Sequence, residues 1–215
     1  MGDVIRLSER RDALRRRTTG RRVRSRAEFF FDLACPFTYL ASERVERSFD
    51  EVAWRAASSE ALRRSCLADD DVSAAVVRRA AEERAVALRL PLVWPERFPE
   101  PVPVAMRVAA FAAVCGRGAA FVLAATRLAF CGGYNLDDPE ILAEAAAAAG
   151  VVLDDTLHAA RDEGRDGPIE AAGRALLAAG ADRLPALRVG RALYWGEERV
   201  GEALVAARMA RAAAL

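Results

Sequence analysis

The sequence contains no lysine and a single histidine, and both shortages narrow the chemistry open to it. All 32 basic residues of the 215-residue chain are arginines. Together with abundant alanine, this indicates GC-rich coding, so an isolated arginine carries less functional information than usual. The one histidine, His158, falls in a predicted helix far along the chain from the cysteine-proline motif at Cys35. The sequence therefore offers no Cys–His pair of the kind that activates a catalytic nucleophile.

The sequence also lacks long apolar runs and a strong net charge. No segment reaches the roughly 18 uninterrupted apolar residues of a membrane-spanning helix, and no apolar stretch near the start resembles a secretory signal. The formal net charge of +1 gives no general attraction to nucleic acids or membranes. With 53% hydrophobic residues, the chain can bury a sizeable core. We therefore expect a cytoplasmic globular protein with neither nucleic-acid nor membrane partners.

A Cys-x-x-Cys pair is missing as well. The four cysteines are Cys35, Cys66, Cys115 and Cys131, and their spacing matches neither a dithiol motif nor a zinc site, so no metal is expected. In a reducing cytoplasm all four are expected as free thiols. The last three fall on stretches predicted as Ala-rich helices and are expected to be inert, unless the fold brings one of them beside Cys35 as a resolving thiol.

The segment Phe29–Leu40 is the most informative part of the sequence. Its aromatic run predicts a strand over residues 28–34, followed by a helix over 36–49. Pro36 suits the first turn of that helix, which places Cys35 at the helix N-terminus, where the dipole favours a thiolate. The fourth position of the motif is Thr38, whose hydroxyl could donate to the sulfur. The motif is therefore monothiol and cannot close a disulfide within itself.

The order of predicted elements indicates two structured parts behind an Arg-rich extension. Residues 1–26 contain ten Arg and three acidic residues, a local charge of +7, and are expected to form a flexible, solvated extension; an arm for an acidic partner, RNA or a membrane surface is the alternative. A strand–helix–strand unit and a C-terminal hairpin with a helix form one part, and a block of helices, beginning with a helix over 59–89, forms the other. We expect a four-stranded mixed sheet, with domain boundaries at residues 27–59 plus 181–215 and 60–180.

This order resembles the DsbA-like thioredoxin superfamily. Within it, the chain looks most like the branch of 2-hydroxychromene-2-carboxylate isomerases and kappa-class glutathione transferases. The matching motifs are Phe31–Leu40, Gly133–Asp137 after a Pro-rich connection, and Leu184–Leu187 with Tyr194–Arg199. The resemblance implies a thioredoxin-like α/β fold with a large all-helical insertion. Two features depart from the branch: it commonly has Ser where this chain has Cys35, and redox members usually have a second Cys where it has Thr38.

The resemblance also implies a site. Cys35 and Thr38 would be catalytic, and Pro185 would be the cis-proline that faces the thiol. Glutathione or another low-molecular-weight thiol, such as mycothiol, would be the cofactor. The residues implied in binding it are Pro36, Phe37, Leu184, Pro185, Trp195, Glu197, Glu198 and Arg199. Glu198 stands where the branch has Asp, and both glutamates also suit the N-terminus of a helix, where acids are favoured by the dipole.

Three functions follow as alternatives. The first is a monothiol oxidoreductase that exchanges disulfides between Cys35 and a low-molecular-weight thiol. The second is a glutathione- or mycothiol-dependent isomerase or transferase, acting on an electrophile, in which Cys35 positions the cofactor thiol. The third is a thioredoxin-like module without catalysis that binds a partner. The sequence does not determine the oligomeric state, and a homodimer stays open.

Overall fold

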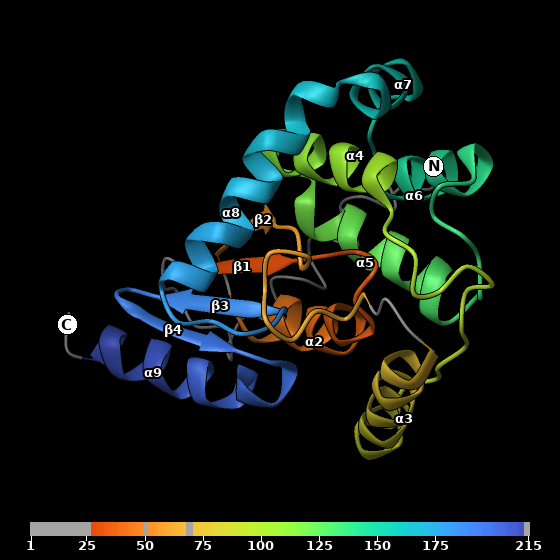
Figure 1. Ribbon diagram of the computed structural model, residues 1–215. Helices are drawn as coiled ribbons and strands as arrows, with labels where there is room; N and C mark the ends of the chain where they lie inside the picture. Colours follow the sequence, from red (N-terminus) through yellow and green to blue (C-terminus); the bar gives the residue numbers. More distant parts are fainter. Residues whose placement is uncertain (1–26, 50, 68–70, 213–215) are drawn as a thin grey trace, which may run out of the picture.

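The computed structural model describes residues 27–49, 51–67 and 71–212, so the predicted Arg-rich extension lies outside the described residues. A four-stranded sheet with strand order β2-β1-β3-β4 forms the centre of the molecule (Figure 1). β1 pairs with β2 in parallel and with β3 antiparallel, and β3 pairs antiparallel with β4. The predicted mixed sheet is therefore confirmed, with strands β1 (Ala27–Phe31), β2 (Val52–Ala56), β3 (Ala186–Val189) and β4 (Ala192–Trp195).

The central strand β1 is buried on both faces, which explains its continuous aromatic run. Phe29 and Phe31 point to one face, where both are fully buried and pack against Trp54 of β2, with ring centroids 4.8 and 6.2 Å away. Phe30 points to the other face and joins a smaller cluster that includes Leu184. β1 thus ends within the core, and the residues that follow it, from Asp32 to Cys35, are buried as well.

Helices surround the sheet, and proline sets several of their first turns. Pro36, Pro103 and Pro139 each begin a helix at a position where the missing N–H costs nothing. Gly150, with φ of 72°, ends α6 in the left-handed conformation. The helices are α2 (Pro36–Ser48), α3 (Asp71–Leu88), α4 (Pro103–Val114), α5 (Gly118–Phe130), α6 (Pro139–Ala149), α7 (Leu153–Arg161), α8 (Asp166–Ala178) and α9 (Val200–Ala212).

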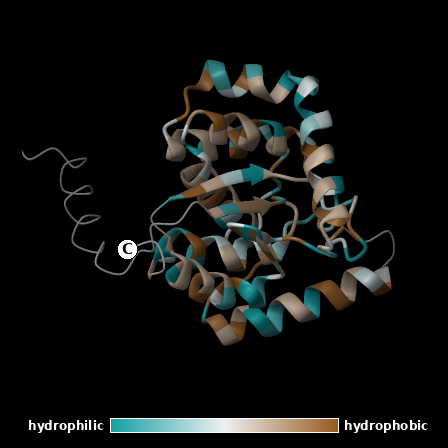
Figure 2. Cartoon of the chain, turned by 90° about the vertical axis from the view of Figure 1, so that its left-hand side faces the viewer, coloured by the Kyte–Doolittle hydropathy of each residue, from teal (hydrophilic) through white to brown (hydrophobic). Residues whose placement is uncertain are grey.

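The two structured parts predicted from the sequence share one hydrophobic core. A single cluster of buried side chains extends from β1 and α2 through α4, α5 and α6. In Figure 1, α4, α6 and α7 lie above the sheet, α8 descends to its left end and α5 lies to its right, whereas α2 and α9 lie below β1 and α3 projects away at the lower right. The helices carry both hydrophilic and hydrophobic residues along their lengths (Figure 2), as helices with one covered face do. No described helix has the length and apolar character needed to cross a bilayer.

The prediction of a helix over residues 59–89 is wrong in its first third. Residues 57–67 form an irregular loop, and α3 begins only at Asp71. The Ser58 hydroxyl accepts a hydrogen bond from the amide of Glu60, and the Ser65 hydroxyl accepts one from the amide of Leu67. Serine side chains that bind nearby backbone in this way compete with helix formation. We call residues 57–67 the β2–α3 loop.

Candidate active site

Cys35 is the N-cap residue of α2. A turn after β1 brings it there: its amide donates to the carbonyl of Asp32 at 3.1 Å, and its own carbonyl accepts from the amide of Thr38 at 2.9 Å. The side chain is fully buried. Its sulfur therefore lies at the positive end of a 13-residue helix, where the peptide dipoles stabilise negative charge.

Cys66 forms a disulfide with Cys35, with the two α-carbons 5.3 Å apart and a sequence separation of 31 residues. The expectation of four free thiols is therefore wrong for this pair, and so is the expectation that Cys66 lies inert on a helix. Cys66 lies near the end of the β2–α3 loop, and the described free cysteines are Cys115, which is exposed, and Cys131. The Cys35-Pro36-Phe37-Thr38 motif is monothiol, but the fold supplies a second sulfur from elsewhere in the chain.

The buried carboxylate of Asp32 holds the beginning of the β2–α3 loop. One of its oxygens accepts hydrogen bonds from the amide and the hydroxyl of Ser59, at 2.9 and 2.8 Å, and the other accepts from the amide of Ala34 at 3.0 Å. Burial raises the pKa of Asp32, and the hydrogen bonds from Ser59 and Ala34 oppose that shift only in part. The same side chain therefore ties the turn before Cys35 to the loop that carries Cys66.

Helix α8 supports the loop from behind. The amide of Ser58 donates to the carbonyl of Ile169 at 3.2 Å. Gly173, one turn further along α8, faces the same residue: a β-carbon at position 173 would lie 2.3 Å from the carbonyl oxygen of Ser58. Only glycine allows this close approach of helix and loop.

Pro185 follows Leu184, the residue whose carbonyl oxygen faces the Cys35 sulfur. The Leu184–Pro185 peptide bond is cis, as the resemblance implies. The carbonyl oxygen of Leu184 lies 3.7 Å from the sulfur of Cys35, and the carbonyl of Pro185 accepts from the amide of Gly196 at 2.8 Å. The residue two positions before β3 therefore packs directly on the Cys35 sulfur.

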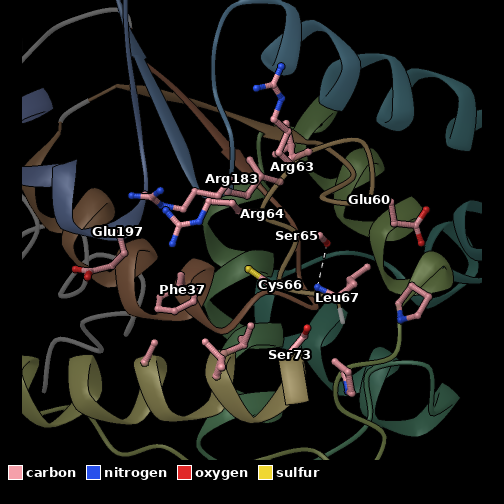
Figure 3. A pocket seen from close by; sticks show the side chains of 18 of the residues that line it. Phe37, Glu60, Arg63, Arg64, Ser65, Cys66, Leu67, Ser73, Arg183 and Glu197 are labelled. Atoms are coloured by element: carbon pink, nitrogen blue, oxygen red, sulfur yellow. Dashed lines mark hydrogen bonds between the residues drawn. The ribbon is translucent and has the colours of Figure 1, made fainter. Parts of the chain in front are cut away.

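A pocket of about 1120 Å³ opens beside the disulfide, and Cys66 forms part of its wall (Figure 3). The β2–α3 loop contributes one side of the pocket, and α3 contributes an apolar side that includes Val76, which is 65% exposed. Cys66 belongs to the lining, whereas Cys35 lies behind it. The other lining residues include Phe37, Arg63, Arg64, Leu184, Glu197 and Glu198.

The structure separates the predicted site residues into two groups. Phe37, Leu184, Glu197 and Glu198 line the pocket beside the disulfide. Trp195 and Arg199 do not line it: the Arg199 guanidinium lies over the Tyr194 and Trp195 rings and pairs with Glu202 at 2.8 Å.

The two catalytic-motif neighbours of Cys35 are buried. Pro36 forms the first turn of α2, and the Thr38 side chain is fully enclosed. The Thr38 hydroxyl oxygen accepts from the amide of Asp32 at 3.4 Å. Thr38 therefore contributes to the turn that precedes Cys35.

The charged residues expected to bind a thiol cofactor already have partners within the chain. Glu197 is buried and forms ion pairs with Arg44 of α2 and Arg84 of α3. Glu198 forms an ion pair with Arg183. A glutathione-like molecule in the pocket would therefore meet compensated charges at these positions rather than free carboxylates.

The residues that the sequence interpretation missed come from the β2–α3 loop and its anchor. They are Asp32, Ser59, Arg63 and Arg64; Cys66 was one of three cysteines considered as a possible resolving thiol, and the disulfide selects it. A local signal for the loop was present, because Ser58, Ser59 and Ser65 bracket it and serine is typical of turns. Among the residues described, no group of three or more His, Cys, Asp or Glu side chains could hold a metal ion.

A family model described as a DSBA-like thioredoxin domain matches residues 26–205. No curated protein matches the chain. Among solved structures, the chain is similar to a 2-hydroxychromene-2-carboxylate isomerase, with 18% identity, a TM-score of 0.70, and coverage of 87% of this chain and 97% of that one. It is also similar to a probable DsbA oxidoreductase from Streptomyces coelicolor, with 21% identity, a TM-score of 0.63, and coverage of 85% and 89%.

A third similar structure is a protein from Nitrosomonas europaea to which the name protein disulfide isomerase has been assigned. It shares 13% identity with this chain at a TM-score of 0.63, with coverage of 85% of this chain and 97% of that one. At these identities the three structures establish a common fold. They include both redox and isomerase names, so they do not select one chemistry.

Proposed function

Because the chain belongs to the DSBA-like thioredoxin domain family, we propose that it is a thiol–disulfide oxidoreductase whose redox centre is the Cys35–Cys66 pair. One observation carries the proposal. The cysteine at the start of α2 is bonded to a second sulfur that lines a pocket of about 1120 Å³. The β2–α3 loop thus supplies the thiol that the Cys35-Pro36-Phe37-Thr38 motif lacks.

The proposed reaction transfers two electrons. In the oxidised protein, a thiolate of the substrate attacks the disulfide, forms a mixed disulfide with one cysteine, and releases the other cysteine as a thiolate. A second substrate thiolate attacks the mixed disulfide, which yields a substrate disulfide and leaves both protein cysteines reduced. An external disulfide re-oxidises the pair by the same steps in reverse. Glutathione and mycothiol are the low-molecular-weight thiols that we propose as reactants.

A second candidate is a glutathione- or mycothiol-dependent isomerase or transferase. The size of the pocket favours it, because the volume of about 1120 Å³ suits a cofactor and an electrophile together. A non-catalytic binding module would be expected to have this pocket filled by its own side chains. The open pocket therefore argues against that third function. In the second candidate the cofactor supplies the reacting thiol, and Cys66 has no chemical role.

The decisive experiment measures exchange and isomerisation in matched variants. We expect reduced glutathione to open the Cys35–Cys66 bond of the intact chain. Differential alkylation and mass spectrometry measure this opening. Cys35→Ser and Cys66→Ser should each lower the rate of catalysed disulfide exchange at least about 100-fold, whereas Cys115→Ser, at an exposed free cysteine, should leave it unchanged. Full exchange activity in Cys66→Ser would contradict the proposal. Isomerisation of a hydroxychromene carboxylate that survives Cys66→Ser would establish the second candidate instead.

A further inference from the structure

Within the proposed redox centre, the two cysteines differ in their position relative to the pocket. Cys35 has a relative exposure of 0%, and Cys66 has one of 3%. The difference is small in area but decisive in position, because Cys66 lines the pocket while Cys35 does not. In Figure 3 the Cys66 sulfur lies in the middle of the pocket wall, between Phe37 and Leu67. A molecule that enters the pocket therefore meets Cys66 first.

The surroundings of Cys35 close the alternative approach. A thiolate attacks a sulfur from the side opposite the bond that breaks, so the rear of the attacked sulfur must be open. The carbonyl oxygen of Leu184 lies 3.7 Å from the Cys35 sulfur, and Leu184 itself is buried. The neighbouring residues Pro36 and Thr38 are buried as well. In the oxidised protein, Cys66 lines the pocket, whereas Cys35 is buried and is not among the lining residues.

The two sulfurs also differ as leaving groups. Cys35 caps α2, a helix of 13 residues, so the helix dipole stabilises the thiolate that would form when the disulfide breaks. Cys66 lies in the irregular β2–α3 loop, preceded by Ser65 and followed by Leu67, without a helix N-terminus. A disulfide exchanges faster when the departing sulfur is the better stabilised thiolate. Access and leaving-group stability therefore point to the same sulfur as the target.

We propose that Cys66 is the catalytic residue that forms the mixed disulfide with substrate, and that Cys35 is the buried leaving and resolving thiol. This inference rests on the proposed oxidoreductase function and assigns the order of events within it. A substrate thiolate forms a new bond with the Cys66 sulfur while the Cys66–Cys35 bond breaks, and the electron pair of that bond leaves on Cys35. In the opposite direction, a Cys66 thiolate attacks an external disulfide, and Cys35 then displaces the bound thiol. The cysteine of the Cys-Pro motif thus has the internal role.

The first test traps the intermediate in the intact wild-type chain and needs no variant. The oxidised protein is mixed with reduced glutathione, quenched with acid after short intervals, alkylated, and digested for mass spectrometry. We expect glutathione on Cys66 and the alkyl group on Cys35. Glutathione on Cys35 with the alkyl group on Cys66 would overturn the assignment while leaving the oxidoreductase function intact. A disulfide that glutathione does not open at all would instead overturn the proposed function itself.

Two serine variants give an independent test. In Cys35→Ser, the remaining pocket thiol should react with oxidised glutathione to give a lasting adduct on Cys66. In Cys66→Ser, the remaining Cys35 is enclosed, and its adduct should form at least about tenfold more slowly. Circular dichroism of both variants shows whether each keeps the fold. Equal rates in two folded variants, or a faster rate for Cys35, would contradict the inference.

Discussion

The carboxylate of Asp32 binds Ser59 twice, through the backbone amide at 2.9 Å and the hydroxyl at 2.8 Å. Asp32 follows β1 directly and Ser59 lies in the β2–α3 loop, so this contact joins the two cysteine-bearing segments. The carboxylate is enclosed, and burial raises its pKa. The contact that joins these two segments is therefore also one whose strength depends on pH.

Asp32 should make the protein less stable as pH rises from about 4 towards 7. An acid whose pKa is raised by folding binds its proton more tightly in the folded state. The folded state then holds more protons than the unfolded chain in that pH range, so the free energy of unfolding falls with increasing pH. In Asp32→Asn this contribution is absent. Chemical denaturation at several pH values should therefore show the stability advantage of wild type over Asp32→Asn shrinking as pH rises. An advantage that grows with pH would contradict the prediction.

Gly173→Ala should destabilise the protein although alanine is the better helix former. The added β-carbon would lie 2.3 Å from the carbonyl oxygen of Ser58, so helix α8 or the β2–α3 loop must shift. We expect a loss of about 1 to 3 kcal/mol in the free energy of unfolding, as in other overpacked sites. Gly167→Ala in the same helix is the matched control, since its β-carbon would meet nothing within 4 Å, and should be neutral or stabilising by up to about 1 kcal/mol. Equal effects of the two substitutions would show that the loop does not pack on Gly173.

The sheet and the start of α2 could be predicted because their signals are local. The Phe29–Phe31 run, the proline after Cys35 and the compact hairpin turn each act within a few residues. Pro36 does begin α2, and the strands form the expected mixed sheet. In these places the local preference and the tertiary packing agree.

The sequence did not determine which cysteine, if any, would pair with Cys35, because the disulfide depends on a contact across 31 residues of sequence. The interval contains β2 and a serine-bearing loop that was interpreted as helix, and on a helix Cys66 would have had no reason to meet Cys35. The interpretation of Glu197 and Arg199 failed to anticipate their partners for a similar reason. Two arginines from different helices reach Glu197, while Arg199 turns to Glu202 three residues further on. Side-chain pairing of this kind becomes visible only in the folded chain.

Glu197→Gln should loosen α3 and lower the stability of the protein. The carboxylate is 1% exposed and joins Arg44 of α2 to Arg84 of α3. Glutamine keeps the volume but removes the charge, and hydrogen bonds to charged groups are worth about 1.5 to 3 kcal/mol each. We expect a loss of about 1 to 3 kcal/mol in the free energy of unfolding and faster amide hydrogen exchange in α3 than in α5.

The control for this prediction is Glu202→Gln. The Glu202 side chain is 59% exposed and pairs with Arg199, three residues earlier in the chain. Loss of this ion pair should change the free energy of unfolding by no more than about 0.5 kcal/mol. A loss in Glu197→Gln no larger than that of the control would mean that the buried ion pairs do not hold α3.

Reduction of the Cys35–Cys66 bond should destabilise the folded chain. The disulfide closes a loop with a sequence separation of 31 residues, and closing a loop of that length restricts the unfolded chain by about 3 to 4 kcal/mol in the chain-entropy model. Denaturant unfolding of wild type with and without a reductant should show this difference, and Cys66→Ser should match the reduced protein in either condition. Cys115→Ser, which leaves the disulfide in place, should respond to the reductant as wild type does. If wild type had the same stability in both conditions, the bond would not constrain the unfolded chain, and the β2–α3 loop would be held beside Cys35 by Asp32 and α8 alone.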